Sequence, residues 1–192
     1  MIPTQLLTTW IADEKSLGAQ HVQYAVLSSQ GLNGASHGRV VAIREITEEN
    51  LIFFTQKRTR KVEEIKNNNK VSLTFWFERC AREVIIEGEA HFLSKKQNIE
   101  YWASYPKWAQ IRFCSYAPTS AMPIVSKQLL EEKRLEIEKF TQNNELPYSP
   151  DYCGIAIRPT RFVFYTYRLD ELSDVWEYQM EGTNFVKQTL SP

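Results

Sequence analysis

Residues 71–77 read VSLTFWF, and residues 82–93 read REVIIEGEAHFL. In the first stretch every second position is V, L, F or F, and the positions between them are S, T and W. An alternation with a period of two residues is typical of a β-strand that buries one face. The two stretches therefore predict consecutive strands, the second of them long, and they set the fold class of the chain.

Three further strands precede this pair. We expect them at residues 21–29, 37–46 and 51–56, with a turn at residues 30–36 that contains Gly31, Asn33 and Gly34. Residues 59–67 predict a short helix. Five antiparallel strands interrupted by one small helix are typical of a closed or partly closed barrel rather than a doubly wound parallel sheet.

The sequence on either side of the barrel adds helices and more strands. An amphipathic helix is expected at about residues 4–17, and two more at residues 95–104 and 126–142. The last strands are expected at residues 152–158, 161–168, 173–181 and 184–189. No repeat or low-complexity linker divides the sequence, so we expect one domain over residues 1–192, mainly β with helices (α+β).

The charges balance, with 23 Lys and Arg against 23 Asp and Glu. A neutral chain has no global field that would draw it to nucleic acid or to an acidic membrane, so a bound anion needs a local cluster. No run approaches 18 apolar residues, and the N-terminus lacks a signal-peptide pattern, which predicts a cytoplasmic protein.

Cysteines and histidines give no metal-site pattern. The three cysteines lie far apart at an odd count, which predicts reduced, buried thiols rather than disulfides. The three histidines lack ligand spacing, so no metal is expected. These residues are Cys80, Cys114, Cys153, His21, His37 and His91.

Thr59, Arg60 and Lys61 form a local conflict. Two cations begin a helix whose N-terminus already carries a partial positive charge. A bound phosphate would resolve the conflict, because Thr59 could cap the helix while free N–H groups and both cations act as donors. The alternative is a solvated surface helix in which Glu63 and Glu64 offset the charge.

Arg39 and Arg44 lie five residues apart in one predicted strand. In a regular strand their side chains point to opposite faces, about 16 Å apart along the strand. They can serve one ligand if the strand bends, if the ligand is elongated, or if it lies at a subunit interface. Otherwise each is a rim or salt-bridge residue.

Taken together, these segments resemble the pyridoxamine 5′-phosphate oxidase-like FMN-binding split-barrel family. The resemblance rests on RVVAIR at residues 39–44, FFTQ at 53–56, TRK at 59–61, NNNKVSL at 67–73 and REVIIEGEA at 82–90. It continues through Tyr101, YCGIAIRP at residues 152–159 and LSP at residues 190–192. It implies an antiparallel split β-barrel and a homodimer with FMN at the subunit interface.

The resemblance also implies the cofactor site. Arg39, Arg60 and Lys61 would hold the FMN phosphate, and Phe54 and Thr55 would line the cofactor. Arg44 stands where the family has a lysine, Glu83 where it has a glutamine, and Tyr165 where it has a tryptophan. The full implied set is Arg39, Val40, Val41, Ala42, Arg44, Phe54, Thr55, Thr59, Arg60, Lys61, Glu83 and Tyr165.

The implied substrate site departs further from the family. Arg44, Tyr101 and Tyr105 are the candidate substrate residues, but Tyr105 replaces an arginine and Ala109 replaces a serine, both phosphate partners. The arginine and histidine beside the pyridoxal ring and a nearby flavin-contacting arginine correspond to Glu171, Ser173 and Val175. A glutamine-serine pair that contacts FMN corresponds to Pro118-Thr119.

The resemblance implies an FMN-dependent oxidase that acts on pyridoxamine or pyridoxine 5′-phosphate. A hydride moves from the substrate to the flavin, dioxygen reoxidises the flavin, and no side chain is expected to act as a catalytic nucleophile or base. Alternatives are a flavoprotein of this fold with a different aromatic substrate, a non-catalytic FMN-binding protein, or a split barrel that uses haem or a deazaflavin.

Overall fold

The computed structural model describes residues 2–192, which form two compact units. Unit 1 comprises the described part of Met1–Phe53 with Glu64–His91 and Ile155–Pro192, and unit 2 comprises Phe54–Glu63 and Phe92–Gly154. In chain order the elements are α1 (Pro3–Ser16), β1 (Tyr24–Gln30), β2 (Ser36–Ile46), β3 (Leu51–Gln56), α2 (Arg60–Asn67), β4 (Lys70–Phe77), β5 (Arg82–Phe92), α3 (Lys95–Ala103), α4 (Lys107–Tyr116), α5 (Lys127–Phe140), β6 (Tyr152–Thr166), β7 (Asp174–Glu181) and β8 (Asn184–Leu190).

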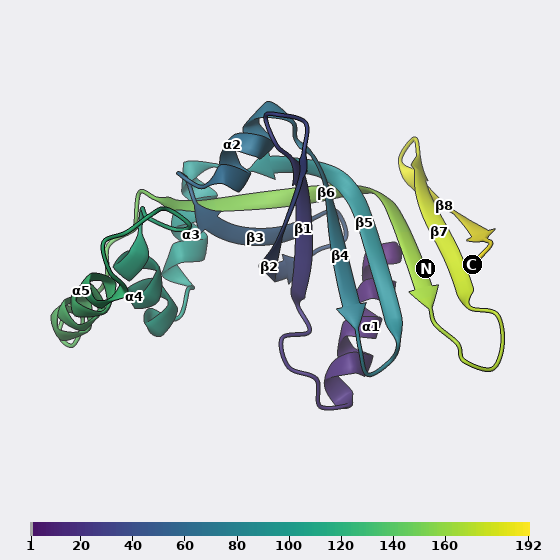
Figure 1. The fold of residues 1–192 in the computed structure, drawn as a ribbon, viewed down its shortest axis with the longest axis horizontal. Helices are drawn as coiled ribbons and strands as arrows, with labels where there is room; N and C mark the ends of the chain where they lie inside the picture. The colour runs from purple at the N-terminus through teal and green to yellow at the C-terminus, as the bar shows by residue number, and fades with distance from the viewer. Residues whose placement is uncertain (1) are drawn as a thin grey trace. The chain divides into compact units, whose positions relative to one another are not determined.

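The strands form one sheet in the order β3-β2-β1-β4-β5-β6-β7-β8. Because β3 also pairs with β6, the first six strands in this order close into a barrel, and β7 and β8 continue from it as a hairpin. Figure 1 shows β1, β4 and β5 side by side. The predicted α+β fold with an antiparallel split barrel is confirmed.

Inside unit 1 the apolar half of each strand alternation faces the core. Ala25 of β1 lies opposite Val41 of β2, Leu73 of β4 lies opposite Ile86 of β5, and all four are buried. Full burial of a side chain such as Leu73 contributes about 2 kcal/mol to folding. The period-two pattern that predicted the strands is therefore the pattern that fills the barrel.

Helix α1 is fixed to the turn between β4 and β5 by a buried carboxylate. Glu14 is 3% exposed, and its two oxygens accept hydrogen bonds of 2.9 Å from the backbone N–H groups of Arg79 and Cys80. Arg82 adds an ion pair to Asp13 at 2.8 Å. A buried carboxylate with satisfied oxygens orients the helix without leaving an unpaired charge.

Unit 2 is organised around aromatic rings. Helix α3 begins with a capping box, in which Ser94 Oγ accepts from Gln97 N–H and the Gln97 side chain accepts from Ser94 N–H. The buried rings of Trp102, Phe113 and Tyr152 pack together, with Trp102 and Phe113 centroids 5.0 Å and 5.3 Å from that of Tyr152. This cluster is the core that holds α3 and α4 together.

Three expectations about secondary structure need correction. Helix α4, Lys107–Tyr116, was not predicted. The strands expected at residues 152–158 and 161–168 are one continuous strand, β6, which runs through Pro159. The strand expected from residue 21 begins at Tyr24, because His21 has a φ of +58°, a left-handed conformation found in turns rather than strands.

Beside Pro159, the strands β5 and β6 come unusually close. A Cβ added at Gly88 would lie 2.4 Å from the carbonyl oxygen of Arg158. Glycine therefore permits a contact that a side chain would prevent, and the strand continues past the proline.

The expectation of three buried thiols was also too broad, since Cys153 is buried whereas Cys80 and Cys114 are only partly buried.

Candidate functional site

The N-terminal end of α2 brings three predicted cofactor residues together in unit 2. Lys61 Nζ donates to Thr55 Oγ1 over 3.1 Å. Thr59 is 3% exposed; its carbonyl accepts from the N–H groups of Val62 and Glu63, and its hydroxyl donates to the carbonyl of Gln56 at 3.0 Å. The first turn of α2 is therefore held against the end of β3, with Lys61 directed to Thr55.

Gln56 is a polar residue of this region that the sequence did not single out. Its side chain is 2% exposed, and its Oε1 accepts from the backbone N–H of Ser120 at 3.1 Å. This bond fixes the amide orientation, and the buried Nε2 has no hydrogen-bond partner among residues 2–192. A buried unpaired donor is costly, so an acceptor at this position would be stabilised.

Arg39 lies in a second cluster, inside unit 1. Its Nη2 pairs with Glu64 Oε2 at 2.6 Å, and its Nη1 donates to Ser29 Oγ at 2.5 Å. Ser29 in turn donates to Glu64 Oε2 at 2.6 Å, and His37 Nδ1 lies 2.5 Å from Glu64 Oε1. The predicted phosphate ligand is thus tied to a carboxylate of α2.

Glu64 is buried, with 2% of its side chain exposed. Burial alone would raise its pKa, but the hydrogen bonds from Ser29, His37 and Arg39 and the charge of Arg39 lower the pKa to about 2. The carboxylate stays ionised at neutral pH. From the sequence alone, Glu64 was considered only as a charge on a solvated surface helix. Its burial could have been suspected from the strand 37–46, because His37 and Arg39 alternate with exposed residues and polar side chains on an inward strand face need a hydrogen-bond acceptor.

The rest of the RVVAIR segment divides between the two faces of β2. Val40 is exposed and Val41 is buried, while Ala42 is exposed like Val40. Ile43 pairs with Phe53 and Glu45 with Ile52, so Arg44 is an extra residue in a β-bulge. Because a bulge bends its strand and redirects a side chain, the regular-strand spacing of Arg39 and Arg44 does not hold beyond Ile43.

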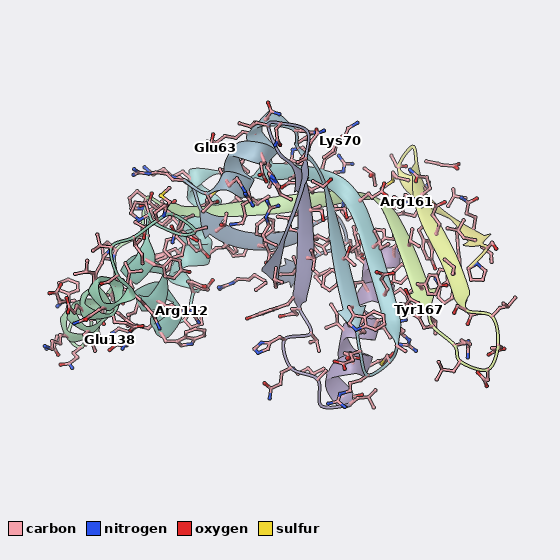
Figure 2. The ribbon with its side chains drawn as sticks, in the orientation of Figure 1. Glu63, Lys70, Arg112, Glu138, Arg161 and Tyr167 are labelled. Atoms are coloured by element: carbon pink, nitrogen blue, oxygen red, sulfur yellow. The ribbon has the colours of Figure 1, made fainter. Side chains whose placement is uncertain are left out.

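Glu83 and Tyr165, two predicted cofactor residues, meet in an aromatic cluster of unit 1. Tyr167, labelled in Figure 2, joins them: its hydroxyl donates to Glu83 Oε2 at 3.4 Å, and its ring centroid is 4.3 Å from that of Tyr165. Trp76 adds an edge contact to Tyr167 at 5.5 Å. Burial and the charge of Glu83 raise the pKa of Tyr167. Sequence reasoning missed Trp76 and Tyr167, which only the strand pairing brings together.

The candidate substrate residues Tyr101 and Tyr105 lie in the aromatic cluster of unit 2. Phe54 stacks on Tyr152 at 4.7 Å and lies 4.9 Å from Tyr101, while Tyr105 lies 5.7 Å from Tyr152. Ala109 is 3% exposed. The two positions predicted to replace a phosphate-binding arginine and serine are thus a packed tyrosine and a buried methyl group.

The segment after β6 has its own ion pairs. Arg168 pairs with Asp174 at 2.7 Å and with Glu171 at 3.1 Å, and its backbone N–H donates to Ser173 Oγ at 3.3 Å. Val175 is buried in β7. Residues 168–174 contain three acidic side chains and one arginine, so this turn carries a net negative charge.

Comparison with known proteins gives consistent results. The family model described as "Pyridoxamine 5'-phosphate oxidase" matches residues 14–163. A pyridoxine/pyridoxamine 5′-phosphate oxidase of Cyanothece sp. is 28% identical over 193 residues, covering 99% of this chain and 88% of that protein. The enzyme of the same name from Vibrio cholerae is 30% identical over 160 residues, covering 83% of this chain and 75% of that protein.

Two solved structures share the fold. PhzG from Burkholderia lata, in complex with tetrahydrophenazine-1-carboxylic acid, has a TM-score of 0.90 at 20% identity and covers 99% of this chain and 92% of its own. A pyridoxamine 5′-phosphate oxidase-related, FMN binding protein from Nostoc punctiforme has a TM-score of 0.80 at 16% identity, covering 98% and 96%. No helix in residues 2–192 combines the length and apolar character needed to cross a membrane.

Proposed function

Because the chain belongs to the pyridoxamine 5′-phosphate oxidase family, we propose that it is an FMN-dependent oxidoreductase. FMN is its cofactor. The activity we propose is oxidation of a small molecule by hydride transfer to the flavin, with dioxygen as the final electron acceptor. Family membership fixes the cofactor, whereas the substrate and the roles of individual residues are inferences from the site.

The observation that carries the proposal is the donor set at the start of α2. Lys61 donates to Thr55, and the buried Nε2 of Gln56, at the end of β3, has no hydrogen-bond acceptor among residues 2–192. A phosphate group supplies several acceptor oxygens and a negative charge that suits a helix N-terminus. The residues present therefore fit FMN, and we assign Arg60 and Lys61 to its phosphate.

The remaining cofactor contacts are proposed from the clusters already described. Phe54, Thr55 and Thr59 would line the cofactor in unit 2. In unit 1 the proposed set is Arg39, Val40, Val41, Ala42, Arg44, Glu83 and Tyr165. Glu83 can accept a hydrogen bond from a ring N–H but cannot donate one, unlike the glutamine of the family.

When bound, FMN supplies the redox chemistry by accepting a hydride and passing electrons to dioxygen. The chain then has to bind, orient and shield the reactants. Arg44 at its bulge keeps a positive charge for an anionic substrate group, and Tyr101 offers a hydroxyl. We propose Arg44, Tyr101 and Tyr105 as substrate-binding residues.

A second candidate is the same chemistry on an aromatic substrate without a phosphate. The packing of Tyr105 against Tyr152 and the burial of Ala109 favour it, because neither position offers the charge-assisted donor that a phosphate needs. Loss of an arginine and a serine removes about 2 to 4.5 kcal/mol of phosphate binding. The third hypothesis is a non-catalytic FMN-binding protein. Steady-state turnover separates it from the other two, because only an enzyme oxidises a substrate repeatedly.

We further propose that the protein is a cytoplasmic homodimer and that residues 1–192 form a single FMN-binding domain. An apolar outer face of unit 1 supports the dimer. Val26 of β1 and Val40 of β2 pair across the two strands and are 42% and 62% exposed, and nearby Tyr24 and Trp76 are 47% and 54% exposed. Exposed apolar patches of this kind commonly mark protein interfaces.

The test is flavin affinity with and without the phosphate. Titration of apoprotein followed by flavin fluorescence should give a Kd for FMN at least about a hundredfold below that for riboflavin, since two or more charge-assisted bonds are at stake. Lys61→Met should raise the FMN Kd about tenfold or more. Lys66→Met, on the last turn of the same helix, is the matched control. Equal affinity for FMN and riboflavin would refute the phosphate assignment.

A further inference from the structure

The Arg39 guanidinium makes its hydrogen bonds within unit 1 through Nη1 and Nη2, and its Nε edge makes none to the described residues. Nη1 and Nη2 bond Ser29 and Glu64, and Nη1 also reaches the Leu27 carbonyl at 3.4 Å. Nε–H and the second N–H of Nη2 have no hydrogen-bond partner among residues 2–192. These two N–H groups share one edge of the planar guanidinium and form a fork that matches two oxygens of a phosphate.

Glu64 sets which edge is presented. Its carboxylate receives donors from three side chains, Ser29, His37 and Arg39, at 2.5–2.6 Å. With 2% of its side chain exposed it cannot relax into water, and Arg39 retains 17% exposure. The carboxylate is therefore the fixed partner and the guanidinium is the group being oriented.

We propose that Glu64 is a positioning residue for the FMN phosphate: it orients Arg39 so that the Nε and Nη2 fork is presented to the phosphate, without touching the phosphate itself. The inference rests on the proposed function, because it assumes that Arg39 binds this group. His37 and Ser29 hold the two carboxylate oxygens of Glu64 from two sides, Ser29 at Oε2 and His37 at Oε1, so that the carboxylate keeps one orientation.

Charge alone predicts the opposite effect of removing Glu64. Deleting a carboxylate near an anion site should tighten anion binding, because a repulsive charge is lost. Positioning predicts weaker binding, because Glu64→Gln replaces a charged acceptor of the Arg39 hydrogen bond with a neutral amide oxygen, and a neutral acceptor holds the guanidinium less firmly. The sign of the change therefore distinguishes the two effects.

The experiment compares Glu64→Gln with Glu63→Gln. Glu63, labelled on α2 in Figure 2, is exposed and its replacement removes the same charge from the same helix. Apoprotein of each variant is titrated with FMN and with riboflavin. For Glu64→Gln we expect the FMN Kd to rise about tenfold while the riboflavin Kd is unchanged, and for Glu63→Gln neither should rise.

Two further variants keep the test decisive. Ser29→Ala removes one link and keeps the charge, so it should fold even if Glu64→Gln does not, and it should raise the FMN Kd about threefold with riboflavin unchanged. In an Arg39→Gln background, Glu64→Gln should add no further loss of FMN affinity, because its effect passes through Arg39.

The outcomes separate this inference from the proposed function. If wild-type protein binds FMN no better than riboflavin, the phosphate site itself is refuted. If wild type discriminates but Glu64→Gln binds FMN equally or more tightly, the positioning role is refuted. A parallel loss for FMN and riboflavin, or an undiminished loss in the Arg39→Gln background, shows a general structural role for Glu64 and also overturns the proposal.

Discussion

Acid should destabilise this protein through Glu64 by an amount that can be worked out in advance. The pKa of the group falls from an ordinary 4.5 to about 2 in the folded chain. A depressed carboxylate pKa contributes stability that is present above the unfolded pKa and lost as the pH falls through the folded one. The difference corresponds to about 3 kcal/mol, present above pH 4.5 and lost progressively between pH 4.5 and 2.

The assay is urea unfolding followed by tryptophan fluorescence at pH values from 7 to 2.5, with wild type and Glu64→Gln in parallel. Other carboxylates, such as Glu177, whose pKa is lowered by hydrogen bonds from Gln188 and Arg161, titrate in both proteins and cancel in the difference. We expect wild type to be the more stable by about 3 kcal/mol at pH 7, and this gap to close as the pH approaches 2. Parallel stability curves at all pH values would show that Glu64 carries no linked proton, and would refute the reasoning.

Two other predictions concern the assembly and the substrate. Trp76→Glu places a charge on the exposed apolar face of unit 1, and sedimentation velocity at micromolar concentration should show monomer where wild type shows dimer; a wild-type monomer with FMN bound would contradict the dimer. Tyr105→Arg with Ala109→Ser restores both family phosphate partners and should raise kcat/KM for pyridoxine 5′-phosphate at least about tenfold, measured by hydrogen peroxide release. Efficient turnover by wild type at micromolar substrate would show that phosphate recognition uses other residues.

The barrel was predictable because strand alternation is a local property. The stretch VSLTFWF predicted β4 within one residue, and the bounds of β3 were predicted without error. The first and last turns of α1 and α5 were also placed within two residues. In β4 and α1 the apolar period in the sequence is the period that the core buries, whereas α5 was placed by its pattern although none of its residues is buried.

Helix α4 was missed because its burial does not follow a helical period. Residues 109, 110, 111, 113 and 115 are all buried, which places buried side chains on several faces of the helix, and the N-cap Pro106 gives no side-chain capping signal. Helices with this pattern arise when the surrounding structure covers several faces, which the local sequence does not encode.

The buried polar residues of the candidate site were missed for a related reason. Glu64 and Gln56 lie in segments whose other features suggested a solvated helix and a plain strand. Their burial depends on partners far along the chain, Ser29 and Ser120 among them. The sequence motifs predicted the charged and aromatic residues of the site. They did not predict that Glu64 accepts a hydrogen bond from Arg39, because that contact depends on how β2 and α2 pack together.

Closure of the barrel by β3 and β6 also bears on aggregation. A strand with an unpaired edge can hydrogen-bond to a strand of another chain, and closure removes that hazard from six strands at once. Within residues 2–192 the outer edge of the sheet is β8, which pairs with β7 alone. Its exposed Lys187 lies 5.0 Å from the Trp176 ring and keeps a charge on that edge. Within the described residues, β8 is therefore the strand edge that still needs protection from intermolecular pairing, and the charge of Lys187 supplies it.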